Sequence, residues 1–520
     1  GPYWQARNCV AATPQSMCTP QALATADMAG DFLGPTPDVD DPLSHDQLED
    51  EYAEVSAYYH ADKFDAWLES LGFVGIPCRT QGEVATIIAN YRGPGDAAGT
   101  PGWFPNAFYT GDCDLTIALG QGEGVDFGWD GDVIYHEIGH GVVDTQMGDD
   151  ALGMPYRRPE GVVNDAGALN EGTADFLSSS FTGDPNMGEY IQTYGGFGRD
   201  NANDFLCPGD LIGEIHADGE PWTAALYEAH AEIGDAFVPV VIDSLAMFAP
   251  DASFEDAAAT VVALSEASLD PAQATTVEEA LGGRNLLDCV RVAPWDAVRR
   301  ELWLIPPDWD DKYRPMRPPP YQVLFEVPED ATVMHLTFDV TAPAKTPIYD
   351  VNLITKRDGP IEFTYEYLGM SYEVSADSQD FYGDITAGVL DLEVTGGERI
   401  YGAFFNLGMD LAMISNLQVE FELAPDPGTS TGATGLDDTG GSTTTITGGA
   451  SEGVIAGSSE DGSSGGSAGQ TALDDGCSCR QRGAPGGAGA WWGLLLLAAG
   501  RRRRGYSITT AGSTSSTSRV

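Results

Sequence analysis

The stretch DVIYHEIGHGVVD, residues 132–144, decides how the rest of the sequence is interpreted. His136 and His140 are four residues apart, so in a helix both imidazoles lie on one face and can bind one metal ion. Zn²⁺ is the metal that such ligands usually take. Glu137 would lie beside the open coordination position, where a carboxylate can take a proton from a bound water. We therefore assign Glu137 as general base and then as general acid.

A third ligand is expected in GALNEGTADFL, residues 167–177. Glu171 and Asp175 are again four residues apart, on what the pattern predicts to be the next helix. Glu171 would complete a His-His-Glu set, and Asp175 would accept the free ring N–H of His136 and so fix its tautomer. Two alternatives stay open: a His-Glu-x-x-His string also arises by chance, and Asp175 could be an ordinary exposed helix charge.

Four segments in this order resemble the thermolysin and fungalysin families of zinc metallopeptidases. They are NAFYTGDCDLTIALGQGEG before the first helix, HEIGH on it, NEGTAD after it, and GEIHADGEPWTAALYE at residues 213–228. The last is similar to the fungalysin stretch in which a histidine precedes a Gly-Glu-x-Trp helix. The resemblance covers roughly residues 50–290, about half of the chain.

This resemblance implies a two-lobed peptidase with a mixed sheet above, helices below, and the zinc helix at the floor of the cleft. His216 is the implied donor to the oxyanion of the tetrahedral intermediate, and Tyr156 is the candidate second donor. Asn106 and Ala107 would bind substrate backbone along an edge strand, and Arg199 would clamp a substrate carbonyl. The alternative for His216 is a packed structural histidine.

Structural Ca²⁺ is expected in addition to Zn²⁺. Asp132 occupies a position that thermolysin uses for calcium, and Asp184 and Glu189 are further candidate ligands in this sequence. His60, in AYYHADKFDAW, is interpreted as a packing residue of an early helix.

The charge balance restricts the partners of the chain. Lys and Arg number 25 against 80 Asp and Glu, which gives a formal net charge of −55. So acidic a surface repels nucleic acid and anionic membranes, and it suits solubility, salt tolerance or calcium binding. Cys9 and Cys18 are close enough in sequence to close a small loop in an exported protein. The pairing of the next four cysteines is left open: Cys78, Cys113, Cys207 and Cys289.

Composition and periodicity predict an α+β chain with two folded domains and additional unfolded sequence. A Pro-rich stretch cannot continue a helix or a central strand, and apolar residues after it alternate with a period of two, as in an antiparallel β-sandwich. The expected parts are an N-terminal segment at 1–46, the catalytic domain at 47–303, a linker at 304–320, a small β-sandwich at 321–424, a disordered Gly/Ser/Thr tether at 425–476, a sorting signal at 477–504 and a tail at 505–520.

The end of the chain resembles the C-terminal sorting signals of myxobacteria and their relatives. GCSC is followed by the apolar run WWGLLLLAAG and by Arg501 to Arg504. The resemblance implies a sorting enzyme as partner and display at the cell surface. A weak tail anchor is the alternative, because the apolar run is short for a spanning helix. The chain opens at Gly1 without an initiator Met or signal peptide, so we expect a truncated or processed start.

Together these features predict a secreted or surface-displayed zinc endopeptidase, a monomer that acts on protein or peptide substrates. One alternative is an inactive relative that serves as a surface binding module, with the β-sandwich recognising a ligand. Such a module has no use for the base Glu137. An aminopeptidase is a third possibility, but nothing in the sequence resembles the acidic motif that captures a free amino terminus.

Overall fold

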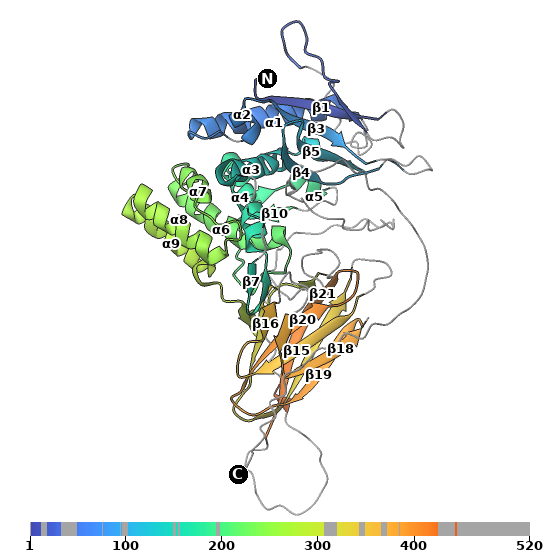
Figure 1. Ribbon diagram of the computed structural model, residues 1–520, viewed down its shortest axis with the longest axis vertical. Coiled ribbons are helices and arrows are strands. Elements are labelled where there is room, and N and C mark those ends of the chain that lie inside the picture. The colour runs from blue at the N-terminus through green and yellow to red at the C-terminus, as the bar shows by residue number, and fades with distance from the viewer. Residues whose placement is uncertain are drawn as a thin grey trace, which may run out of the picture.

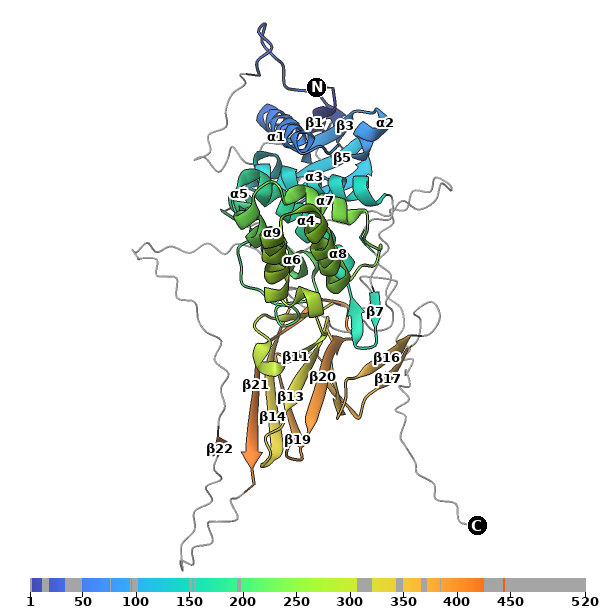
Figure 2. The same ribbon diagram turned by 90° about the vertical axis from the view of Figure 1, so that its left-hand side faces the viewer.

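The structure is a computed structural model, shown in Figures 1 and 2. It describes residues 2–11, 18–32, 49–74, 76–93, 95, 102–148, 152–153, 156–193, 198–305, 320–342, 349–365, 372–383, 385–424 and 443–444. From top to bottom in Figure 1, an N-terminal sheet is followed by a helical part and then by two further sheets. The mixed α+β class predicted from sequence is confirmed.

Short apolar runs build the N-terminal sheet, in the order β2-β1-β3-β5-β4 with β6 paired to β5. Strands β1, β3 and β5 pair in parallel, and β4 pairs antiparallel to β5 at the edge of the sheet. Two disulfides, Cys9–Cys18 and Cys78–Cys113, join segments of this region, and the first confirms the predicted loop. The strands are β1 (Trp4–Val10), β2 (Thr19–Gln21), β3 (Ala85–Tyr91), β4 (Ala107–Asp112), β5 (Leu115–Gly122) and β6 (Val125–Asp126).

Several of the helices begin at a side chain that caps them. Ser253 caps α8 and Asp270 forms a capping box at the start of α9, where Pro271 occupies the first turn. The helices are α1 (Glu51–Ser70), α2 (Pro77–Gln81), α3 (Gly131–Met147), α4 (Asp165–Thr182), α5 (Glu189–Thr193), α6 (Ile215–Ile233), α7 (Val238–Leu245), α8 (Phe254–Ser268) and α9 (Pro271–Gly283), with 3-10 turns at Phe127–Trp129, Leu286–Asp288 and Trp295–Ala297.

Two five-stranded sheets form the C-terminal part. One has the order β11-β13-β20-β15-β18, and the other has β12-β21-β14-β19 with β22 added to β21. The period of two predicted after the Pro-rich stretch is confirmed on β14, where Met334, Leu336, Phe338 and Val340 are all buried. The strands are β11 (Val292–Pro294), β12 (Leu302–Leu304), β13 (Gln322–Glu326), β14 (Ala331–Thr341), β15 (Val351–Arg357), β18 (Ser378–Gly383), β19 (Ala387–Glu393), β20 (Arg399–Asn406), β21 (Ala412–Leu423) and β22 (Thr443–Thr444).

Three two-stranded sheets complete the described fold: β7 (Tyr156–Arg158) with β8 (Gly161–Val163), β9 (Asn186–Met187) with β10 (Arg199–Asp200), and β16 (Glu362–Tyr365) with β17 (Tyr372–Ser375). Ile361 and Phe363, at the start of β16, pack in a small apolar cluster with Leu324, Ile354 and Phe405 of the β13 sheet. A larger core runs through the helical part and into the C-terminal sheets.

Strand pairing crosses two of the boundaries expected from sequence. β1 belongs to the expected N-terminal segment, yet it pairs with β3. β11 and β12 precede the expected linker, yet they pair with β13 and β21. Most of the linker lies outside the described residues, as do the tether, the sorting signal and the tail, except that Thr443–Thr444 forms β22. Among the described residues, no helix is long and apolar enough to cross a membrane.

Candidate metal site

The predicted metal ligands lie together where α3 and α4 pack against each other. Asp130 caps α3, because its side chain accepts a hydrogen bond from the Asp132 N–H. Every residue of the helix from Val133 to Val143 is buried. His136, His140 and Glu171 are 3%, 1% and 1% exposed. Their three ligand atoms lie within 4.8 Å of one another, and they form the one group of three or more such ligands found in the described part of the chain. These residues could hold a metal ion.

The Nδ1 atoms of both imidazoles, which face away from the metal position, are hydrogen-bonded. His136 Nδ1 lies 2.7 Å from Asp175 Oδ1, and His140 Nδ1 lies 2.9 Å from Asn170 Oδ1. Both partners are acceptors, so each Nδ1 carries the proton in the neutral ring and each Nε2 keeps its lone pair. Asp175 therefore has the contact predicted for it and is not an exposed charge, since it is fully buried.

The inner atoms converge on one point. The two Nε2 atoms lie 3.1 Å apart, and Glu171 Oε2 lies 3.2 Å from that of His136 and 3.5 Å from that of His140. Within the described residues, Glu171 Oε2 makes no hydrogen bond of ordinary geometry. Three buried lone-pair atoms facing one another repel unless a cation or protons lie between them. Two imidazole nitrogens and one carboxylate oxygen are a donor set that fits Zn²⁺, with a fourth position left for water or substrate.

The electrostatics of the site agree with a cation-binding function. Burial opposes ionisation of Glu171, but His216 and His140 outweigh it and hold the pKa of this carboxyl well below its usual value. Burial also opposes protonation of His140, but Glu171 and Glu137 outweigh it and raise the pKa of the imidazole to about 9. The site therefore attracts positive charge, which a metal ion would supply in place of protons.

Arg199 reaches the site through Asp175. Its Nε lies 2.6 Å from Asp175 Oδ2 and its terminal nitrogen 2.7 Å from Oδ1, a bidentate pair with the side chains 14% and 0% exposed. Burial raises the pKa of Asp175, but Arg199 and His136 outweigh that effect, and the net pKa is lowered. Arg199 thus fixes the carboxylate that orients His136. Its contact with a substrate carbonyl stays a prediction.

His216 lies at the site from a third helix. It is the second residue of α6, and its Nε2 is 3.4 Å from Glu171 Oε2. Its Nδ1 lies 2.6 Å from Oε1 of Glu214, the residue that caps α6. Burial disfavours the charged ring, but Glu171 and Glu214 outweigh it and raise the pKa of His216 to about 9. A ring that donates from Nε2 can therefore face the metal site, although its role as oxyanion donor stays a prediction.

The predicted substrate strand passes beside the metal ligands. Asn106 immediately precedes β4 and Ala107 begins it, and β4 packs against α3. Asn106 O accepts a hydrogen bond from Gly120 N, and Tyr109 lies beside His140 with 6.5 Å between ring centroids. Tyr156 begins β7, but its side chain lies outside what the structure describes, so its assignment as a second oxyanion donor stays a prediction.

Two contacts of the site are not visible in the sequence pattern. Asn170 precedes Glu171 and Glu214 lies two residues before His216, so adjacency to a candidate site residue is the only local signal for either. Both act on an imidazole nitrogen that points away from the metal position.

The calcium ligands stay unplaced. Asp132 Oδ2 accepts a hydrogen bond from Gly188 N at 3.2 Å, and burial together with Asp130 and Glu189 raises the pKa of Asp132 to about 7. Asp184 instead accepts from Asn186 N in an exposed turn. His60, interpreted as a packing residue, contacts the Tyr135 hydroxyl through Nδ1 at 2.5 Å.

Comparison with known proteins gives limited similarity. No family model matches the sequence, and no curated protein sequence is similar to it. Among solved structures, the chain is similar to the precursor of protealysin, a metalloproteinase from Serratia proteamaculans, at 18% identity over 54% of this chain and 87% of that chain, with a TM-score of 0.36. A family GH115 4-O-methyl-α-glucuronidase with specificity for decorated arabinogalactans shares 11% identity over 39% and 30% of the two chains, with a TM-score of 0.09. At such TM-scores neither likeness bears on function, which rests on the site itself.

Proposed function

We propose that this protein is a zinc-dependent endopeptidase in which His136, His140 and Glu171 hold the metal. The observation that carries the proposal is that two imidazole Nε2 atoms and one carboxylate oxygen, from buried residues, converge on one point. Both Nδ1 atoms are hydrogen-bonded to acceptors, so both Nε2 atoms are left to bind the metal. Glu137 adds a further buried carboxylate on the same helix, near enough to His140 to raise the pKa of that ring. A purely structural metal site needs no such extra carboxylate.

Zinc, when bound, supplies Lewis acidity and lowers the pKa of a coordinated water. Glu137 then takes the proton from the attacking water and delivers it to the leaving amine nitrogen. His216 donates from Nε2 to the developing oxyanion, with Glu214 holding its other nitrogen. Asn106 and Ala107, at the start of the edge strand β4, bind the extended substrate backbone by strand addition.

Export and surface display form the second part of the proposal. Among the described residues, three disulfides support an oxidising compartment: Cys9–Cys18, Cys78–Cys113 and Cys207–Cys289. The tail motif GCSC with Arg501 to Arg504 is the feature that a sorting enzyme would recognise. The folded part acts as a monomer on protein or peptide substrates, with structural Ca²⁺ as a further cofactor.

The test compares the parent protein with Glu137→Gln. Zinc content is measured by elemental analysis, and cleavage is measured with casein and with an internally quenched peptide whose amino terminus is blocked. We expect one zinc in each protein, cleavage of both substrates by the parent, loss of cleavage on chelation, and no cleavage by the variant. A parent with bound zinc but no cleavage would instead be a binding module. A parent that cleaves only unblocked peptides would be an aminopeptidase.

A further inference from the structure

The helices that carry Glu171 and His216 both begin beside the C-terminal sheets. α4 starts at Asp165, six residues before Glu171, which is about 9 Å at 1.5 Å per residue. α6 starts at Ile215, directly before His216. The position of each helix start therefore sets the position of a functional side chain.

A buried ion pair fixes the start of α4. Arg291 lies 2.5 Å from Asp165 Oδ1, and these side chains are 2% and 4% exposed. Arg291 directly precedes β11, which pairs with β13, and its carbonyl accepts a hydrogen bond from Gln322 N at 3.0 Å. The first residue of the ligand helix is thus linked to a strand of the C-terminal sheet.

A second link holds the β7–β8 hairpin, which leads directly into α4. Both carbonyls of its turn accept hydrogen bonds from the C-terminal part: Pro159 O from Phe363 N at 2.7 Å, and Glu160 O from Gln322 Nε2 at 3.1 Å. Gln322 is fully buried, and it also exchanges hydrogen bonds with the Ile361 backbone at 2.6 and 2.8 Å. One amide therefore joins β13, the start of β16 and the hairpin turn.

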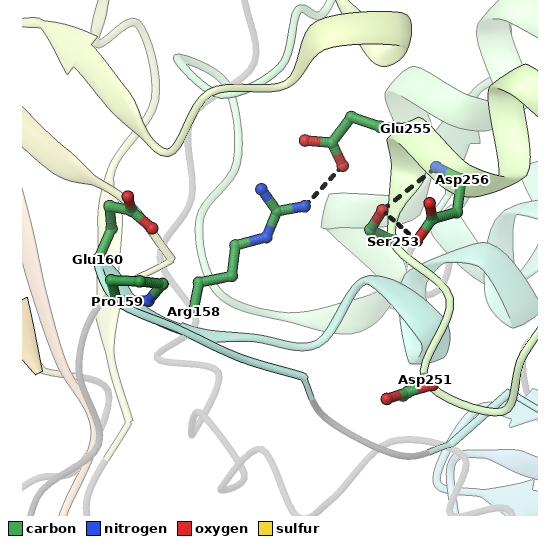
Figure 3. A pocket seen from close by; sticks show the side chains of 7 residues that line it. All are labelled: Arg158, Pro159, Glu160, Asp251, Ser253, Glu255 and Asp256. Atoms are coloured by element: carbon green, nitrogen blue, oxygen red, sulfur yellow. Dashed lines mark hydrogen bonds and ion pairs between the residues drawn. The ribbon is translucent and has the colours of Figure 1, made fainter. Parts of the chain in front are cut away.

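A pocket lies on the other side of the hairpin, among the described residues. This pocket of about 420 Å³ separates the turn from the start of α8, and Arg158 spans it to reach Glu255 at 2.7 Å (Figure 3). Besides the ion pair of Arg158 with Glu255, the two hydrogen bonds from the C-terminal part hold the turn among the residues that the structure describes.

The segment before α6 is linked in the same way. Trp303 N, on β12, donates to Ile212 O at 2.9 Å. Arg299 Nε lies 3.0 and 3.1 Å from the two oxygens of Asp210, a carboxylate that is 1% exposed. Both contacts fall within the few residues that lead into His216.

We propose that the C-terminal part, with its two five-stranded sheets, is a positioning element of the metal site, with Gln322 setting the start of α4 and Arg299 setting the start of α6. The inference rests on the proposed function only where proteolysis is measured. Misplacing a catalytic group by about 1 Å costs on the order of a hundredfold in rate, and loss of outer contacts weakens a metal site about 10- to 100-fold. The C-terminal part thus belongs to the catalytic unit.

The test uses the full chain with Gln322→Met, which keeps the length of the side chain and removes its hydrogen bonds. Gln379→Met is the matched control, because Gln379 bonds only weakly, at 3.4 Å, to Asn352 within the same sheet. Zinc affinity is measured by chelator competition, and amide hydrogen exchange is followed over residues 158–168. We expect Gln322→Met to weaken zinc binding about tenfold and to speed exchange in that segment. The control should match the parent in both.

Arg299→Met keeps the proposal testable if the buried variant does not fold, since the Arg299 side chain is 40% exposed. It should lower kcat about tenfold while the zinc affinity stays at the parent value, because only α6 moves. Parent-like zinc affinity and exchange in Gln322→Met, or an unchanged kcat in Arg299→Met, would overturn the inference while leaving the peptidase in place. A parent without proteolysis would instead remove the proposed function, and zinc affinity and exchange would still decide the positioning.

Discussion

Replacing Asp175 by Asn is the sharpest test of how the proposed zinc site is held. The carboxylate is fully buried and faces three donors: His136 Nδ1 and two nitrogens of Arg199. Asn offers one acceptor oxygen and one NH₂ group, so in either orientation an N–H faces another donor. If it faces His136, that ring must change tautomer and place its proton on Nε2, where the metal would bind.

Two separate losses follow from this geometry. The disturbed imidazole should weaken zinc binding about 10- to 100-fold, which is about 1.4–2.8 kcal/mol. Arg199, whose side chain is 14% exposed, keeps its charge and loses the carboxylate that it pairs with, while Glu171 and Glu220 still act on it from farther away. Breaking one partner of a buried ion pair costs about 3–5 kcal/mol of stability. Stability should therefore fall by more than the metal affinity does.

The double variant Asp175→Asn with Arg199→Met separates the two effects. It removes the stranded cation, so the metal-free protein should regain much of the lost stability, whereas zinc affinity should stay low. Thermal unfolding of metal-free protein reports the first quantity, and chelator competition reports the second. A folded Asp175→Asn variant with the zinc affinity of the parent would refute the idea that Asp175 orients the His136 ligand.

Three further predictions concern other parts of the chain. His216→Ala should lower kcat with little change in KM, because it removes about 2–4 kcal/mol of transition-state stabilisation. A variant that unfolds instead would identify His216 as a packed structural histidine. Burial raises the pKa of Asp218 to about 7, so the folded state holds this proton more tightly than the unfolded state does. Its stabilising contribution is complete below pH 3.8 and is lost as the pH rises through about 7, up to about 4 kcal/mol in all. The free energy of unfolding, measured by denaturant titration at several pH values in that range, should depend less steeply on pH in Asp218→Asn than in the parent. Deleting residues 476–520 should release active enzyme into the medium, and activity that stays cell-bound would contradict surface anchoring through the tail.

The grouping of the candidate metal ligands could be predicted because their geometry is local. Residues four apart share a helix face whatever the rest of the chain does, so His136 and His140 follow from sequence, and so does the pair Glu171 and Asp175. The contact of Arg199 with Asp175 does not, because it joins a two-residue strand to a helix 24 positions away. No periodicity marks so short an element.

The division of the chain was hard to predict for the same reason. β11 and β12 are three residues long, too short to show an alternation of buried and exposed side chains. Their membership of the C-terminal sheets is decided by pairing with Gln322 and Ile414 and their neighbours, which no local pattern encodes. The strands before and after the Pro-rich linker therefore belong to the same sheets, which the linker's composition does not indicate.

Two glycines that lie next to candidate ligands in the motifs explain how three helices bring their side chains to one point. Gly139 lies between the two histidines, and a Cβ there would lie 2.7 Å from Ala174 Cα on α4. Gly172 follows Glu171, and a Cβ there would lie 2.6 Å from Gly219 O on α6. Glycine inside a helix costs about 1 kcal/mol relative to alanine, so its presence at both crossings indicates a packing requirement. Spacing along each helix places the ligands on a face, but these two missing side chains let the faces approach until the Nε2 and Oε2 atoms lie within 3.1–3.5 Å of one another.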